Sequence, residues 1–263
     1  MTSEHGLTIE CLGHRMGIAI NGDGAAELTT MAVEAWERCL VDAPASEGAH
    51  QVQVLIRPGA MASRSATVVS APTLEAAMEM LSQSVTLAGV TKSAGDLLML
   101  HAAGLADPAT GRTAVLVGPS GMGKSTATRA LGREWGYVSD ETVAVTAAGD
   151  IVSYPKPLSL IEDGRWKRQA SPSSLGLLVA PETLRPACVV LLNRRDEGNG
   201  SVREVPLTEA VARAAEQSSF LGHLERPLQR IAAVVREAGC FEVSYAETPQ
   251  LREAVSHLMQ ERS

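Results

Sequence analysis

One stretch of the sequence has the residue types and the spacing that bind a phosphate chain. Residues 118–125 read Gly-Pro-Ser-Gly-Met-Gly-Lys-Ser, which fits the P-loop pattern G-x-x-x-x-G-K-[ST]. Its glycines permit backbone conformations that point successive N–H groups at one anion. Lys124 is expected to reach the β- and γ-phosphates, and the Ser125 hydroxyl is expected to bind Mg²⁺. The residues predicted to contact the nucleotide are Gly118, Pro119, Ser120, Gly121, Met122, Gly123, Lys124, Ser125 and Thr126.

Two elements must hold this loop in place. The β-branched and apolar run from Thr113 to Val117 predicts a buried strand that leads directly into the motif. A helix is expected from Lys124 to Trp135, with Gly136 at its C-terminal cap. The helix would add the positive end of its dipole to the phosphate site. A strand, loop and helix in this order indicate a site for ATP and Mg²⁺.

Two adjacent carboxylates, Asp140 and Glu141, follow a short strand predicted at residues 137–138. In an open α/β sheet, the strand ends beside a P-loop face the ligand. We therefore expect one carboxylate to hold Mg²⁺ and one to accept the proton of an attacking hydroxyl. Asp140 and Ser125 are the predicted metal ligands. The alternative interpretation is a solvated turn, which is the commoner role of an Asp-Glu pair.

Other polar residues form less specific patterns. His101 lies on an apolar run before the P-loop strand, where a histidine is more often a packing residue. Lys156 lies between two prolines, which favour extended backbone. Three more basic residues lie in the polar stretch 162–186, which is expected to be a long loop: Arg165, Lys167 and Arg168. Such residues can close over phosphates, but a charge cluster in a loop is more often simply solvated.

Residues 189–196 invite comparison with a guanine-binding motif, because GTPases read guanine with Asn-Lys-x-Asp after a buried strand. Here Asn193 is followed by Arg194 in place of lysine. No Asp-x-x-Gly follows the P-loop at a suitable distance. We therefore interpret Asn193 to Asp196 as a turn after the strand expected at Cys188 to Leu192.

Composition narrows the class of protein. Apolar residues make up 45% of the chain and aromatic residues only 3%, so an aliphatic core is expected. The net charge of −7 argues against nucleic-acid binding, which usually needs a basic surface. The sequence shows no apolar run long enough for a membrane span and no signal-peptide pattern, so a cytoplasmic location is expected. Its four separated cysteines form no metal motif.

These motifs together resemble the HPr kinase/phosphorylase superfamily, especially its shorter HPr-kinase-like members. The similar stretch runs from about Leu97 to Leu160. It contains Leu-His-Ala-Ala at 100–103, the P-loop, the acidic pair and Tyr-Pro-Lys-Pro-Leu-Ser-Leu at 154–160. The resemblance implies an α/β P-loop kinase core with a mixed sheet, related to phosphoenolpyruvate carboxykinase, at residues 96–263. Residues 1–95 have strand and helix patterns without a catalytic signature, and we expect a small α+β N-terminal domain there.

The resemblance also implies a reaction: an ATP- and Mg²⁺-dependent kinase would transfer the γ-phosphoryl group to a hydroxyl. The acceptor would be a serine of a peptide or protein, or a small-molecule alcohol. His101 would occupy the position of the family's active-site histidine. The predicted catalytic residues are then His101, Lys124, Asp140 and Glu141. Because HPr kinases are oligomeric, a homo-oligomer is implied as well.

Three departures from that family bear on the substrate. Ala102 stands where true HPr kinases have glycine, Glu141 stands where they have aspartate, and their glycine-rich signature is missing after Leu160. HPr itself is therefore not the expected substrate, whereas a precursor peptide of a modified-peptide pathway is one option. The alternative function is an ATP-binding regulatory or partner-binding protein with little turnover. A GTPase is a distant third.

Overall fold

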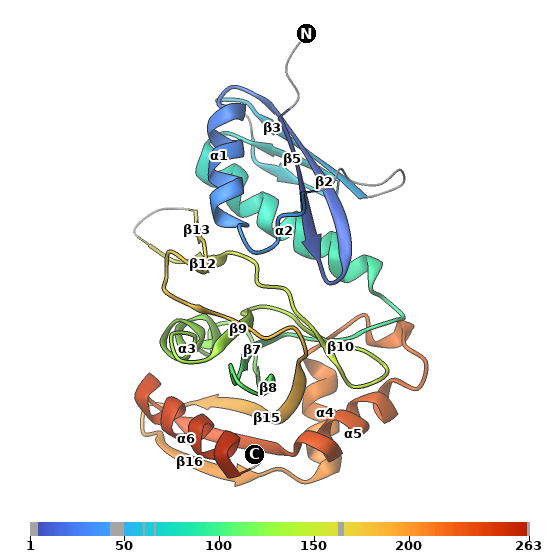
Figure 1. Cartoon of the computed structure of the whole chain (residues 1–263), viewed down its shortest axis with the longest axis vertical. Helices are drawn as coiled ribbons and strands as arrows, with labels where there is room; N and C mark the ends of the chain where they lie inside the picture. Colours follow the sequence, from blue (N-terminus) through green and yellow to red (C-terminus); the bar gives the residue numbers. More distant parts are fainter. Residues whose placement is uncertain (1–4, 43–49, 60, 66, 163–165, 262–263) are drawn as a thin grey trace. The chain divides into compact units, whose positions relative to one another are not determined.

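The computed structural model shows a mixed α/β protein (Figure 1). It describes residues 5–42, 50–59, 61–65, 67–162 and 166–261. Helices and strands alternate along the chain, and strands pair in both parallel and antiparallel fashion. Within these ranges, no helix combines the length and the apolar character needed to cross a membrane.

The chain divides into two compact units. One comprises Met1–Lys92 together with Tyr154–Leu175, and we call it the N-terminal unit. The other comprises Ser93–Ser153 together with Gly176–Ser263, and we call it the P-loop unit. The sequence suggested a single boundary near residue 95. The segment 154–175, which the sequence places in the second domain, instead groups with the N-terminal unit.

The N-terminal unit contains a five-stranded sheet in the order β1-β2-β3-β5-β4. The first two strands form an antiparallel hairpin, while β2, β3 and β5 are parallel neighbours. Helix α1 buries Leu28, Ala32 and Ala35, which recur at the helical spacing of three to four residues. The elements are β1 (His5–Cys11), β2 (His14–Gly22), α1 (Ala25–Ala35), β3 (His50–Ile56), β4 (Ser63–Arg64), β5 (Val68–Ala71), α2 (Leu74–Lys92), β12 (Leu158–Leu160) and β13 (Arg168–Ala170).

The expectation of one long loop at 162–186 was wrong. Strand β13 pairs antiparallel with β12 and packs against α2. The backbone N–H of Lys167 donates to Glu79 Oε2 at 2.7 Å. Two strands of the other unit, β14 (Leu178–Val179) and β15 (Arg185–Arg194), also begin before residue 186. These pairings satisfy the backbone N–H and C=O groups of this stretch. Its side chains are polar, so its strands have no apolar pattern in the sequence.

The P-loop unit is built on a seven-stranded sheet in the order β14-β9-β7-β8-β15-β18-β16. A smaller sheet has the order β11-β10-β6-β17. The elements are β6 (Leu98–Leu100), β7 (Ala102–Ala106), β8 (Arg112–Val117), α3 (Lys124–Leu131), β9 (Gly136–Ser139), β10 (Val143–Val145), β11 (Ile151–Val152), β14 (Leu178–Val179), β15 (Arg185–Arg194), β16 (Asn199–Glu204), α4 (Leu207–Glu216), β17 (Ser218–Ser219), the 3₁₀-helix η1 (Leu221–His223), α5 (Pro227–Ala238), β18 (Cys240–Tyr245) and α6 (Thr248–Glu261).

The large sheet of this unit has an apolar core on each face. Helices α4 and α5 contribute to one core, and α3 and α6 contribute to the other (Figure 1). Strand β15 supplies both, because Val189 and Leu191 belong to the first core and Val190 and Leu192 to the second. The three adjacent strands β8, β15 and β18 run parallel, so their carboxyl ends meet at one edge. That edge carries the P-loop.

One helix of this unit differs from its prediction, and two strands lie in stretches for which no element was predicted. Helix α3 ends at Leu131 rather than Trp135, its C-cap residue is Gly132, and the predicted cap Gly136 is instead the first residue of β9. Strand β7 has the sequence Ala-Ala-Gly-Leu-Ala, whose small residues lack strand propensity. It forms because β8 and β9 pair with its two edges. Strand β16 is a polar edge strand paired with β18.

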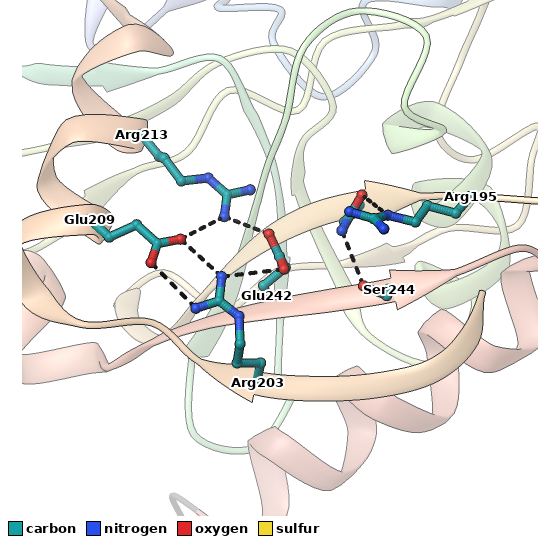
Figure 2. A network of polar contacts seen from close by, with 7 residues as sticks. Arg195, Arg203, Glu209, Arg213, Glu242 and Ser244 are labelled. Atoms are coloured by element: carbon teal, nitrogen blue, oxygen red, sulfur yellow. Dashed lines mark hydrogen bonds and ion pairs between the residues drawn. The ribbon is translucent and has the colours of Figure 1, made fainter. Parts of the chain in front are cut away.

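A network of four charged side chains joins β16 and β18 to α4. Figure 2 shows the two carboxylates alternating with two guanidinium groups. Arg203 contacts Glu209 at 2.9 Å and Glu242 at 3.3 Å, and Arg213 contacts Glu209 at 3.2 Å and Glu242 at 2.5 Å. Burial alone would raise the pKa of Glu242, but the hydrogen bond and charge of Arg213, followed by those of Arg203, hold it below the ordinary value. The network therefore stabilises the ionised carboxylate.

Replacing Glu242 with glutamine is expected to lower the free energy of unfolding at pH 7 by about 1 kcal/mol. Because the folded-state pKa is depressed, this contribution is present above the unfolded pKa of 4.5 and is lost as the pH falls through the folded value. Urea unfolding from pH 7 downward should show the difference between parent and variant shrinking below about pH 4.5. Glu134→Gln, in the exposed pair with Arg252, is the control and should have little effect. If the loss of unfolding free energy in Glu242→Gln is the same at every pH, the contribution of Glu242 is not electrostatic.

Candidate functional site

The P-loop connects β8 to α3 at the carboxyl edge of the large sheet. Gly121 and Gly123 adopt φ angles of 86° and 88°, in the left-handed region that favours glycine. Gly123 is also the N-cap residue of α3, so the helix begins at Lys124. A side chain at Gly123 would meet the Tyr245 hydroxyl at 3.2 Å. The loop thus needs glycine for its backbone and for the close approach of β18.

Lys124 folds back over the loop. Its ammonium group donates hydrogen bonds to the carbonyl oxygens of Gly118 at 2.5 Å and Pro119 at 3.1 Å. The residue is 7% exposed, and this burial lowers the pKa of the ammonium group to about 8, although Asp140 and Glu141 act to raise it. A cation held this way can exchange two neutral carbonyl partners for phosphate oxygens. The ammonium group therefore lies against the loop that is predicted to bind phosphate.

Asp140 faces the P-loop from the end of β9. The Ser125 hydroxyl donates to Asp140 Oδ2 at 3.1 Å, and the Tyr137 hydroxyl donates to Asp140 Oδ1 at 3.2 Å. Asp140 is only 5% exposed, so these bonds satisfy a carboxylate that burial would otherwise penalise. The two residues predicted to bind Mg²⁺ thus lie within hydrogen-bond distance of each other.

The structure also brings His101 to this site. Its imidazole is half-buried, and its pKa is lowered first by burial and then by the charge of Lys124. A hydrogen bond to the backbone of Glu141 and the charges of Glu141 and Asp140 oppose that shift without reversing it. The imidazole is therefore neutral at pH 7. The four predicted catalytic residues lie close enough to interact electrostatically, although they come from separate segments.

The remaining predicted residues divide into two groups. Within the loop, Pro119, Ser120 and Thr126 are exposed, whereas Met122 is half-buried and offers its carbonyl to Tyr245. The basic candidates at 156–168 belong to the N-terminal unit. There Lys156 is 1% exposed and donates to the Pro157 carbonyl at 3.1 Å. Lys167 and Arg168 are exposed, and Arg165 lies outside the described residues.

Two tyrosines support the site, and the sequence analysis missed both. Tyr137 lies three residues before Asp140, and this spacing at a strand end was the only signal for their contact. Tyr245 is buried at the end of β18 and donates a hydrogen bond to the Met122 carbonyl across 123 positions of sequence. No local pattern encodes such a contact. Each hydroxyl is hydrogen-bonded to a residue of the predicted site, Tyr137 to Asp140 and Tyr245 to Met122.

The oxygen atoms of Ser125 and Asp140 suit Mg²⁺, which prefers hard oxygen ligands. Magnesium in nucleotide sites is usually held by one or two carboxylates together with substrate phosphates. The described part of the chain has no group of three or more His, Cys, Asp or Glu placed to hold a metal ion. A magnesium ion here would thus take Ser125 and Asp140 as its protein partners and the rest of its ligands from nucleotide and water.

Comparison with known proteins assigns no family to this chain. No protein-family model matches it, and no curated protein is significantly similar to it. The function is therefore inferred from the geometry of the site.

Replacing Tyr245 with phenylalanine is expected to weaken binding of an ATP analogue about three- to tenfold, because the P-loop loses the hydrogen bond at Met122. Isothermal titration calorimetry at pH 7 measures the change. Tyr154→Phe is the matched control, since its hydroxyl bonds Thr86 in the N-terminal unit. Equal affinities of the parent and Tyr245→Phe would show that the loop holds its shape without β18.

Proposed function

We propose that this protein is an ATP- and Mg²⁺-dependent kinase that transfers the γ-phosphoryl group to a hydroxyl acceptor. The observation that carries the proposal is the 3.1 Å contact between Ser125 Oγ and Asp140 Oδ2. It joins the last residue of a phosphate-binding loop to a buried carboxylate, which is the arrangement that P-loop enzymes use for magnesium nucleotides. Glu141 and His101 add a second carboxylate and a neutral imidazole beside it.

Each side chain then has a separate task. Backbone N–H groups of the loop bind the phosphates, and Lys124 exchanges its carbonyl partners for β- and γ-phosphate oxygens. Tyr137 orients Asp140 toward Ser125. When bound, Mg²⁺ would offset negative charge on the phosphate oxygens. Glu141 is the proposed base for the acceptor hydroxyl, because Asp140 is already committed to Ser125 and Tyr137.

His101 supports the acidic pair without adding charge. Its neutral imidazole is hydrogen-bonded to the backbone of Glu141, and its own backbone N–H donates to the Gln217 carbonyl at 2.7 Å. These bonds fix the junction between β6 and β7 next to the residue proposed as base. We assign His101 a positioning role on these grounds.

The same features support a finer class of kinase. We infer a P-loop kinase core of the HPr kinase type, with a serine of a peptide or protein, or a small alcohol, as acceptor. A cytoplasmic location accords with the four cysteines, which are all buried thiols. The N-terminal unit contains none of the four predicted catalytic residues and is available for acceptor recognition.

A labelling experiment tests the proposal. The protein is incubated with Mg²⁺ and ATP carrying a γ-phosphate label, together with a panel of serine peptides and small alcohols. We expect label to be transferred to an acceptor, and we expect unlabelled ATP to reduce this transfer more strongly than GTP does. Tight ATP binding without transfer to any acceptor would instead support an ATP-binding regulatory protein.

A further inference from the structure

Strands β15 and β18 extend past the point at which β8 turns into the P-loop. Val117, the last residue of β8, is aligned with Leu191, but β15 continues to Arg194. A side chain at Gly118 would lie 3.3 Å from the Leu192 side chain, so β15 runs directly beside the loop. Beyond Leu192, Asn193 is aligned with Ser244 of β18. The ends of these two strands therefore form one flank of the phosphate site.

The opposite flank of the loop holds Asp140, the proposed magnesium ligand. Asp140 follows β9, which lies on the other side of β8 in the strand order, and it contacts Ser125. With Mg²⁺ held by Ser125 and Asp140, the γ-phosphate would lie on the β9 side of the loop. A triphosphate chain that lies along the loop has its nucleoside at the other end. The nucleoside should therefore leave the P-loop toward β15 and β18.

Three polar residues are linked on that flank. Asn193 Nδ2 donates to Ser244 Oγ at 3.1 Å, and Arg195 Nε donates to Asn193 Oδ1 at 3.0 Å (Figure 2). The Arg195 backbone N–H also donates to the Tyr245 carbonyl at 2.9 Å. Among the residues that the structure describes, the Arg195 side chain has no further hydrogen bond or ion pair. The guanidinium is thus held through Nε, with its plane and terminal nitrogens left for a ligand.

We propose that Asn193, Arg195 and Ser244 form the nucleoside subsite, with Arg195 stacked on a purine base. This inference rests on the proposed nucleotide-binding function. A planar guanidinium stacks well on aromatic rings, and Asn193 holds it in one orientation. Both ends of the Asn193 amide are engaged, with Ser244 and Arg195, so this asparagine does not read guanine as a GTPase asparagine does. The sequence predicted only a turn at residues 193–196. In this proposal the same run helps to select the ligand.

The test separates the nucleoside from the phosphates by comparing a non-hydrolysable Mg·ATP analogue with Mg·tripolyphosphate in calorimetry. Arg195→Ala is expected to raise the Kd for the analogue about fivefold to tenfold and to change the Kd for tripolyphosphate less than about twofold. Asn193→Ala should show the same pattern more weakly, because Arg195 loses its support. Arg185→Ala is the matched control. It removes the same charge from the opposite end of β15, where Arg185 pairs with Asp150 at 3.0 Å.

Two outcomes would overturn the inference. If Arg195→Ala weakens both ligands equally, the arginine acts on phosphate and there is no nucleoside subsite at this position. If it weakens neither, the nucleoside binds elsewhere, while the proposed function is unaffected as long as the parent binds both ligands. A parent protein that binds neither ligand would contradict the proposed function and this subsite together.

Discussion

Replacing Lys124 with methionine is expected to raise the Kd for Mg·ATP at least about a hundredfold at pH 7, because a buried ammonium group contributes strong charge-assisted bonds to phosphate. The substitution keeps most of the volume of the side chain. Folding depresses the pKa of this lysine from 10.5 to about 8, so the folded state disfavours its charged form. The variant should therefore lose ligand affinity without losing stability, and its melting temperature is not expected to fall.

The parent protein should show a matching pH dependence. With a pKa of about 8 in the free protein, Lys124 loses its proton above that pH, and a bound triphosphate must then draw a proton from solution. The affinity for Mg·ATP is expected to fall up to about tenfold per pH unit above pH 8. Calorimetry in two buffers of different ionisation enthalpy measures the proton uptake directly. A flat affinity between pH 7 and pH 9.5 in the parent would show that Lys124 keeps its proton over this range and would contradict the lowered pKa.

The second large effect concerns Asp140. Asp140→Asn keeps the shape of the side chain and one acceptor oxygen but removes the charge that faces Ser125. Phosphoryl transfer is expected to slow about 10²- to 10³-fold, because charge placed for the transition state is lost. Binding of ATP without Mg²⁺ should change little, since the loop and Lys124 remain. The rate of label transfer at saturating nucleotide measures the effect.

Asp150→Asn is the control for this substitution. Asp150 is an accessible carboxylate that pairs with Arg185 away from the P-loop, so the same change of charge should leave the rate unaltered. Thermal unfolding of both variants checks that each retains the parent fold. If Asp140→Asn transfers phosphate as fast as the parent, the magnesium site proposed at Ser125 and Asp140 is not the catalytic one.

Local patterns were informative where one segment carries its own signal. The P-loop strand, the glycines of the loop and the start of α3 at Lys124 follow from the types of neighbouring residues. The end of α3 does not, because the helix stops at Leu131 with Gly132 as its C-cap residue, four residues before the predicted end. Strand β7 likewise depends on its neighbours, since its alanines and glycine have no strand preference.

The sequence by itself predicted the phosphate-binding loop at residues 118–125, since that chemistry needs consecutive residues at set spacing. It also singled out Asp140, Glu141 and His101 as separate candidates. Only the tertiary structure decided that Asp140 meets Ser125, that Tyr245 supports the loop, and that Lys156 belongs to the N-terminal unit. These relations join residues far apart in sequence through strand order and register, which long-range packing selects and short-range patterns do not record.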